Sequence, residues 1–189
     1  MGDAQQTRLV LQPSELFNLA GALTLVRLPL AVLFPLIAHD TLTALMVYLA
    51  AVVSDALDGP VARHTGTVSQ IGAFADGWLD KIFHIQAAWA LYNVDLIPAW
   101  WMWLWFSREV VQGALVPWYV RRYMRGSVPP NKPLAIGRVT AVALAGAFVL
   151  SILGLPSLAF PLTLVCGIGG LLSAFGYLRR ELEDLSIHR

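Results

Sequence analysis

Four aspartates stand at spacings that place them in pairs on two helix faces. Asp55 and Asp58 are three residues apart, and Asp76 and Asp80 are four apart. Side chains at these separations lie one turn apart on the same face of a helix. Because a short loop, residues 63–71, joins the two predicted helices, we expect them to be antiparallel neighbours whose acidic pairs face each other.

Four converging carboxylates repel one another unless cations neutralise them. Arg63 and Lys81 are the only basic residues close to them in the chain, which is too few for a buried salt-bridge cluster. Divalent metal is the physical alternative. Carboxylate oxygens are hard ligands that select Mg²⁺, Mn²⁺ or Ca²⁺, and no cysteine or suitably spaced histidine lies nearby to favour zinc. His64 and His84 flank the region and are interpreted as ordinary loop and helix residues. Mg²⁺ is typically shared with phosphate oxygens, so we expect a phosphate or diphosphate substrate.

The elements that must position these acids are membrane helices. Of the 189 residues, 57% are hydrophobic and 13% are charged, against about 25% charged residues in ordinary soluble domains. At about 20 residues per transmembrane helix, the length allows six such helices in a single domain, 1–189. We predict an all-α integral membrane protein with helices near 16–38, 41–62, 72–93, 96–118, 134–153 and 157–178.

The basic residues predict the orientation of these helices. Arg8 precedes the first helix and Arg63 follows the second, and further basic residues lie between the fourth and fifth helices and after the sixth. Short loops rich in lysine and arginine stay in the cytoplasm. Both termini and the acidic pairs are therefore expected at the cytoplasmic face of the inner membrane. A net charge of only +1 argues against a nucleic-acid-binding protein, which needs a dense basic face. Cys166, the single cysteine, is interpreted as a packing residue.

Several charged residues lie inside or at the ends of predicted spans and need a polar cavity. Each costs about 2.5–3.5 kcal/mol even on the lenient insertion scale. The small residues between the acids leave room for close approach of helices or a ligand. Pro60 is expected to break or end its helix unless its freed carbonyl lines the cavity. The charged residues are Arg27, Asp55, Asp58, Asp76, Asp80, Lys81, Arg108, Glu109 and Arg138.

The acidic stretch resembles the signature of the CDP-alcohol phosphatidyltransferases. Every fixed position of that signature is matched, and the similarity extends over essentially the whole chain. The resemblance implies a six-helix membrane enzyme, usually a homodimer, that transfers a phosphatidyl group from CDP-diacylglycerol to an alcohol and releases CMP. The matching residues are Asp55, Asp58, Gly59, Ala62, Arg63, Gly72, Asp76 and Asp80.

The resemblance also implies a role for each matching residue. Asp55, Asp58 and Asp76 would bind two Mg²⁺ or Mn²⁺ ions over the diphosphate. Asp80 would act as the general base on the acceptor hydroxyl and share a metal ion. The CDP-binding site would be formed by Asp55, Gly59, Ala62, Arg63 and Gly72.

The acceptor alcohol is indicated by similarity to the phosphatidylglycerophosphate synthase branch. The segments "DGWLDK" and "LIPAWWMWLWFSREVV" resemble that branch and imply glycerol 3-phosphate, whose phosphate needs cations. The candidates are Arg108, Lys132, Arg138 and Lys81. The chain also departs from that branch at two places. The segment "GRVTAVAL" keeps Gly137 and the cation Arg138 but lacks a further Lys, Thr and Gln, and Gly21 stands where the branch has an asparagine. Cardiolipin synthesis from phosphatidylglycerol, or transfer to inositol phosphate or another polar alcohol, is the alternative.

A divalent-cation transporter is the alternative from a different class of protein. Acidic residues in membrane spans also mark ion pathways. A transporter, however, normally places its site near the bilayer midplane with access from both sides. The acids here cluster at one predicted face, which favours the transferase.

Overall fold

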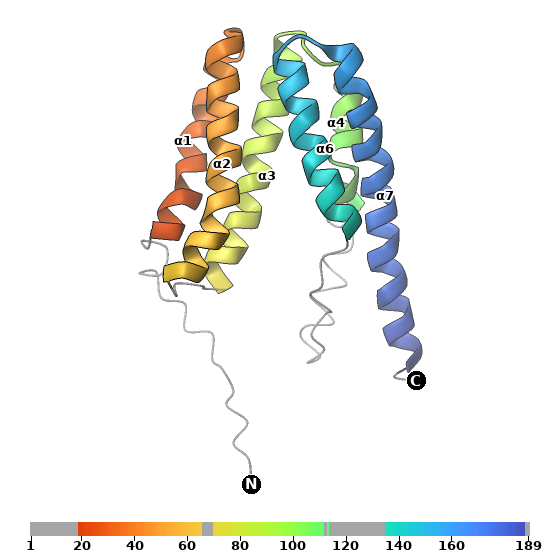
Figure 1. Cartoon of the computed structure of the whole chain (residues 1–189). Helices are drawn as coiled ribbons and strands as arrows, with labels where there is room; N and C mark the ends of the chain where they lie inside the picture. The colour runs from red at the N-terminus through yellow and green to blue at the C-terminus, as the bar shows by residue number, and fades with distance from the viewer. Residues whose placement is uncertain (1–18, 66–69, 112, 114–134, 188–189) are drawn as a thin grey trace. The chain divides into compact units, whose positions relative to one another are not determined.

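The computed structural model describes the backbone of residues 19–65, 70–111, 113 and 135–187, with the side chains of 26–57, 78–111, 113, 136–176 and 179. Figure 1 shows that this described part consists of helices joined by short turns, without strands, as the all-α prediction requires. The chain divides into two compact units, Met1–Ala87 and Ala88–Arg189. Each unit has its own core.

The first unit contains α1 (Leu19–Ile37), α2 (Thr41–Thr65) and the larger part of α3 (Gln70–Asn93). Asp40 begins α2, since its carbonyl accepts a hydrogen bond of 2.9 Å from the amide of Ala44. The Asp40 carboxylate also accepts a hydrogen bond from the Thr43 hydroxyl. That bond lowers the pKa of the Asp40 carboxyl, as expected for an N-cap aspartate.

An aromatic cluster with one ring from each helix forms the core of the first unit. Tyr48 on α2 stacks on Phe83 on α3, with ring centroids 6.0 Å apart. Phe34 on α1 meets both rings edge to face, at 6.5 and 6.0 Å. All three side chains are buried. These contacts fix the three helices against one another one to two turns from Asp55 and Asp80.

The second unit contains the end of α3, α4 (Ala99–Trp105), helical residues 107–111, α6 (Ala135–Ile152) and α7 (Pro156–Ile187). Gly154, with φ +68°, provides the left-handed turn between α6 and α7. Trp105 on α4 packs on Phe148 of α6 at 4.3 Å between centroids. Its indole nitrogen donates a buried hydrogen bond of 3.0 Å to Thr163 on α7. One tryptophan thus joins three helices.

The predicted continuous helix over 96–118 is wrong at Phe106. There α4 ends, with φ −105° and ψ 13° at Phe106, and helix resumes at Ser107. The Ser107 hydroxyl donates to the carbonyls of Leu104 at 3.1 Å and Gly167 at 3.4 Å. Such side-chain bonds compete with the helix ladder and accompany the interruption at Phe106, two residues before Arg108.

Two other helices are longer than predicted. Pro60 does not end its helix, because α2 continues through it to Thr65, beyond the predicted end at 62. A proline removes one backbone donor, which a membrane helix tolerates when neighbours satisfy the freed carbonyl. The last helix, α7, continues beyond the predicted end at 178 to Ile187. Its last residues are mostly good helix formers, so the helix outlasts its apolar part.

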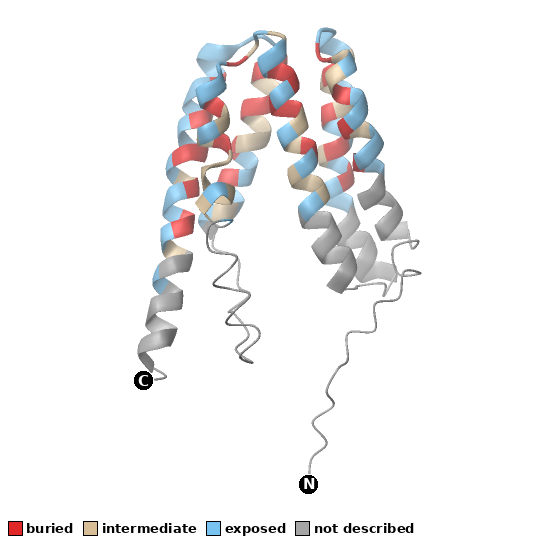
Figure 2. Ribbon diagram, turned by 180° about the vertical axis from the view of Figure 1, so that it is seen from behind, coloured by how far each residue is buried: buried red, intermediate tan, exposed pale blue. Residues whose placement is uncertain are grey.

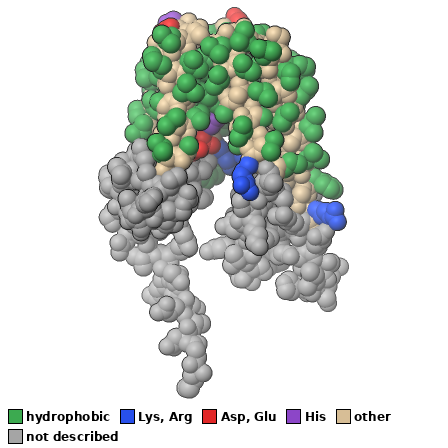
Figure 3. All heavy atoms as spheres, viewed as in Figure 1, with side chains coloured by type: hydrophobic (Ala, Val, Ile, Leu, Met, Phe, Trp, Pro, Cys, Tyr) green, Lys and Arg blue, Asp and Glu red, His purple; other side chains and the backbone are tan. Residues whose placement is uncertain are grey.

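The described helices are apolar outside and carry polar groups inside. One of them, Pro156–Gly176 within α7, is long and apolar enough to cross a membrane, and Val26–Ile37, Thr41–Leu57 and Ile136–Ile152 are shorter apolar helices. Large hydrophobic side chains are exposed along them (Figure 3), Trp103 by 71% and Val142 by 75%. The buried positions (Figure 2) include Arg27 and several hydroxyl side chains. This arrangement is typical of helices that face lipid.

Candidate active site

Asp55, the first acid of the signature, forms an ion pair with Arg27 of α1. The Arg27 Nη2 lies 2.9 Å from the Asp55 Oδ1, and the arginine side chain is only 1% exposed. A guanidinium in an apolar interior requires such a partner. The search for cations near the acids in the sequence missed Arg27, because it comes from another helix. Its presence within an apolar predicted span was the available signal.

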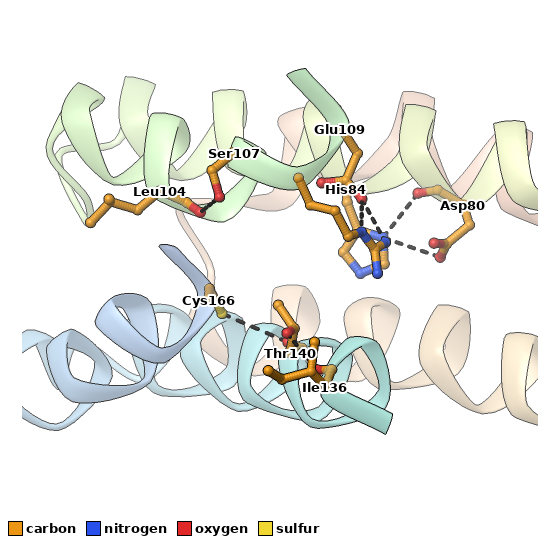
Figure 4. A network of polar contacts seen from close by, with 9 residues as sticks. Asp80, His84, Leu104, Ser107, Glu109, Ile136, Thr140 and Cys166 are labelled. Atoms are coloured by element: carbon orange, nitrogen blue, oxygen red, sulfur yellow. Dashed lines mark hydrogen bonds and ion pairs between the residues drawn. The ribbon is translucent and has the colours of Figure 1, made fainter. Parts of the chain in front are cut away.

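Asp80, the last acid of the signature, contacts His84 one turn further along α3. The His84 Nδ1 lies 3.1 Å from the Asp80 Oδ1 and 2.9 Å from the Asp80 carbonyl oxygen (Figure 4). The His84 Nε2 lies 3.4 Å from the Tyr48 hydroxyl oxygen on α2. Sequence analysis gave His84 no role, although its separation of four from Asp80 pointed to contact.

The remaining signature residues have described backbones only. Each lies in a helix, and α2 and α3 are consecutive in the chain. For Arg63 this corrects the prediction of a loop over 63–71, because α2 continues to Thr65. Their side chains lie outside the part that the structure describes. These residues are Asp58, Gly59, Ala62, Arg63, Gly72 and Asp76.

Asp55 and Asp80 are chemically suited to hold a hard divalent cation. A carboxylate has two oxygens with about four lone-pair sites, so a contact with Arg27 or His84 at one oxygen is compatible with metal coordination. Among the described side chains, no group of three or more metal-binding residues is gathered. The other two expected ligands, Asp58 and Asp76, are not in that set.

Arg108 in the second unit borders a small polar cradle. Its Nε and Nη2 donate to the Glu109 Oε1 at 2.9 and 2.6 Å. A Cβ placed on Gly137 of α6 would lie 3.6 Å from the Arg108 Nη1 and 4.0 Å from the Ser173 Oγ of α7. The Ser173 hydroxyl is buried and has no hydrogen-bond partner in the described part of the chain. Sequence analysis named Arg108 but missed Ser173.

Close packing of α7 holds the Arg108 segment in place. A Cβ on Gly170 would lie 3.2 Å from the Arg108 backbone nitrogen and would also meet the Ser107 hydroxyl. Only glycine permits this approach without displacement. The contact sets the backbone of Arg108 directly against α7, beside the helix face that carries Ser173 one turn later.

Comparison with known proteins agrees with the acidic signature. The family model described as CDP-alcohol phosphatidyltransferase matches residues 17–174. The chain belongs to this family. It is 30% identical over 136 residues, which cover 67% of this chain and 72% of the relative, to the CDP-diacylglycerol–glycerol-3-phosphate 3-phosphatidyltransferases of Escherichia coli (strain K12), Shigella flexneri serotype 5b (strain 8401) and Shigella sonnei (strain Ss046).

Basic residues were predicted to bind the phosphate of the acceptor alcohol in this CDP-alcohol phosphatidyltransferase, and the structure places most of them. Arg138 is exposed and adjoins Gly137 in the cradle. The Lys81 Nζ lies 5.8 Å from the centroid of the exposed Trp78 ring, which is a cation–π contact. Lys132 lies outside the described residues. Cys166 is a buried free cysteine whose thiol donates to the Thr140 carbonyl at 3.8 Å, which confirms it as a packing residue.

Proposed function

We propose that this enzyme transfers a phosphatidyl group from CDP-diacylglycerol to glycerol 3-phosphate, releasing CMP and forming phosphatidylglycerophosphate. Family membership supports the phosphatidyl transfer. The printed activity of the similar proteins supports these two substrates. The observation that carries the proposal is the complete acidic signature on α2 and α3, in which Asp55 is paired with Arg27 and Asp80 contacts His84.

In the proposed reaction, the acceptor hydroxyl oxygen attacks the phosphorus attached to the diacylglycerol. A new phosphorus–oxygen bond forms, and the bond to the bridging oxygen breaks, so that oxygen leaves with CMP. Asp80 accepts the hydroxyl proton, as a positioned carboxylate can. A single displacement is the simplest scheme because the signature contains no Ser, Cys or His nucleophile.

Metal binding by the signature acids is part of the proposal. Asp55, Asp58 and Asp76 would hold two Mg²⁺ or Mn²⁺ ions, with Asp80 sharing one. When bound, the ions polarise the phosphoryl oxygens and stabilise the leaving phosphate. Arg27 holds the Asp55 carboxylate in place from α1. The CDP group would contact Asp55, Gly59, Ala62, Arg63 and Gly72.

The acceptor phosphate is assigned to the cations of the second unit, with Lys81 as a further candidate. The Arg108 contacts with Glu109 use Nε and Nη2. Its Nη1 and the Ser173 hydroxyl both lie close to the position that a Cβ on Gly137 would occupy. A phosphate oxygen placed there could accept from a guanidinium and a hydroxyl, and charge-assisted bonds of this kind are the strong ones. Arg138 and Lys132 would add charge from α6 and from the segment before it.

We propose a six-span homodimer in the inner membrane, with both termini and the active site on the cytoplasmic side. The lipid-facing pattern of the described helices supports the membrane setting. The sequence distribution of arginine and lysine supports the orientation. Chemical cross-linking of the purified protein at low protein-to-detergent ratio tests the dimer, and persistence of the monomer alone would contradict it.

The test of function is CMP release by the purified protein from CDP-diacylglycerol, with and without Mg²⁺, across a panel of acceptors. We expect metal-dependent release with glycerol 3-phosphate. Release only with phosphatidylglycerol would replace the acceptor, and no release with any acceptor would contradict the proposed function. Asp80→Asn should abolish release and retain CDP-lipid binding, whereas the matched variant Asp95→Asn, in an exposed turn, should behave as the parent.

A further inference from the structure

We propose that His84 is a positioning residue that orients the Asp80 carboxylate, and that Tyr48 holds His84 in the required tautomer. Neither residue belongs to the acidic signature. The proposal rests on the proposed function, in which Asp80 accepts the acceptor proton. It adds a hydrogen-bonded chain from α2 through α3 to that base.

The partners of His84 determine where its ring proton resides. The Nδ1 faces the Asp80 Oδ1 at 3.1 Å and the Asp80 carbonyl oxygen at 2.9 Å. An ionised carboxylate and a carbonyl only accept hydrogen bonds, so the Nδ1 must carry a proton and donate it. In a neutral ring the Nε2 is then an acceptor. The Tyr48 hydroxyl, 3.4 Å away, is a donor on that side.

Aromatic packing keeps the His84 ring in this orientation. The ring meets Tyr48 edge to face at 6.0 Å and Phe83 at 5.7 Å. Tyr48 is fully buried and is stacked on Phe83. The His84 side chain is itself only 14% exposed. Rotation of the imidazole would therefore disturb the core that joins α1, α2 and α3.

A donor held at one oxygen of Asp80 determines the plane of its carboxylate. That plane sets the direction in which the carboxylate lone pairs point toward a bound hydroxyl. Proton transfer requires the base within hydrogen-bond reach of the proton it removes, and a misplacement of about 1 Å can cost about 100-fold in rate. His84 therefore acts on turnover through Asp80, without contacting the substrate.

Variants that separate the donor from the ring test this role. His84→Leu removes the donor and should lower kcat about 10–100-fold, the usual cost of losing an orienting partner, with the KM for CDP-diacylglycerol changed less than about 2-fold. His84→Asn places an amide nitrogen near the Nδ1 position and should recover most of that loss. Tyr48→Phe should give a smaller loss. Tyr92→Phe, at an exposed tyrosine of α3, is the control and should have parental activity.

A merely structural role predicts a different result. His84→Asn and His84→Leu would then lose activity equally, in proportion to their loss of thermal stability, and this outcome overturns the proposal. Parental kcat in His84→Leu also overturns it. If the parent protein shows no CMP release with any acceptor, the proposed function fails, and the hydrogen-bond chain is tested separately by spectroscopy.

Nitrogen NMR of ¹⁵N-histidine-labelled protein reads the tautomer without any activity. The His84 signals are those missing from the spectrum of His84→Asn. We expect a ring that carries a proton on Nδ1, with an Nε2 resonance that shifts in Tyr48→Phe. A neutral ring protonated on Nε2 alone would overturn the proposal even if the enzyme is fully active.

Discussion

The Arg27 guanidinium lies 2.9 Å from the Asp55 carboxylate and ties α1 to α2 in the interior of the first unit. The same carboxylate belongs to the acidic signature. Asp55 is 46% exposed while Arg27 is 1% exposed, so the pair extends from the protein interior to a more open position. Packing of α1 and placement of a proposed metal and CDP ligand therefore depend on one interaction.

Loss of this ion pair should affect stability and donor binding together. Arg27→Gln removes a buried cation and leaves Asp55 without it. We expect a loss of about 1–3 kcal/mol in unfolding free energy, below the 3–5 kcal/mol of fully buried pairs because Asp55 is half exposed, together with weaker CDP-diacylglycerol binding. Thermal unfolding in detergent and a binding titration measure both effects. The matched control is Arg27→Lys, which keeps a cation at this position, and equal losses in the two variants would contradict a role for the charge of Arg27.

Ser173 should contribute to acceptor binding. If its buried hydroxyl donates to the acceptor phosphate, Ser173→Ala removes one hydrogen bond to a charged group, worth about 1.5–3 kcal/mol, and raises the KM for glycerol 3-phosphate about 10–150-fold. The KM for CDP-diacylglycerol should not change. Ser151→Ala is the control, because the Ser151 hydroxyl is also buried without a partner among the described residues but lies near the α6–α7 turn. A shift of the same size in both variants would exclude a specific role for Ser173.

The close approach at Gly170 should be needed to place Arg108. A methyl group there meets the Arg108 backbone nitrogen and the Ser107 hydroxyl, so Gly170→Ala must displace the segment. We expect destabilisation of about 1–3 kcal/mol, typical of overpacking, and an increased KM for glycerol 3-phosphate. Gly113→Ala has no neighbour within 4 Å of the new methyl group and serves as the control. Parental kinetics for Gly170→Ala would show that Arg108 can be displaced without consequence.

The sequence predicts those features that depend on local spacing. Periodic apolar runs and turn residues give α1, α2, α3 and α6 to within a few residues, and the aspartate spacing gives the helix faces. The roles of Arg27, His84 and Ser173 could be recognised only from the structure, because each role depends on a partner or neighbour that is close in space. The end of α4 at Phe106 is likewise followed by a contact that is distant in sequence, since Ser107 donates to the carbonyl of Gly167, sixty residues away. Such long-range contacts leave no periodic signal.

The start of α2 gives a pH-dependent test of the helix cap. The Thr43 hydrogen bond lowers the pKa of Asp40 below its ordinary 3.8. A carboxyl whose pKa is lower in the folded state stabilises the fold above its unfolded pKa and loses this contribution as the pH falls through the folded value. The parent should therefore have a higher Tm than Asp40→Asn at neutral pH, and the difference should vanish well below pH 3.8. Asp40→Ala, which has no cap, should have the lower Tm throughout. A difference between parent and Asp40→Asn that persists in acid would show that the charge of Asp40 is not the stabilising element.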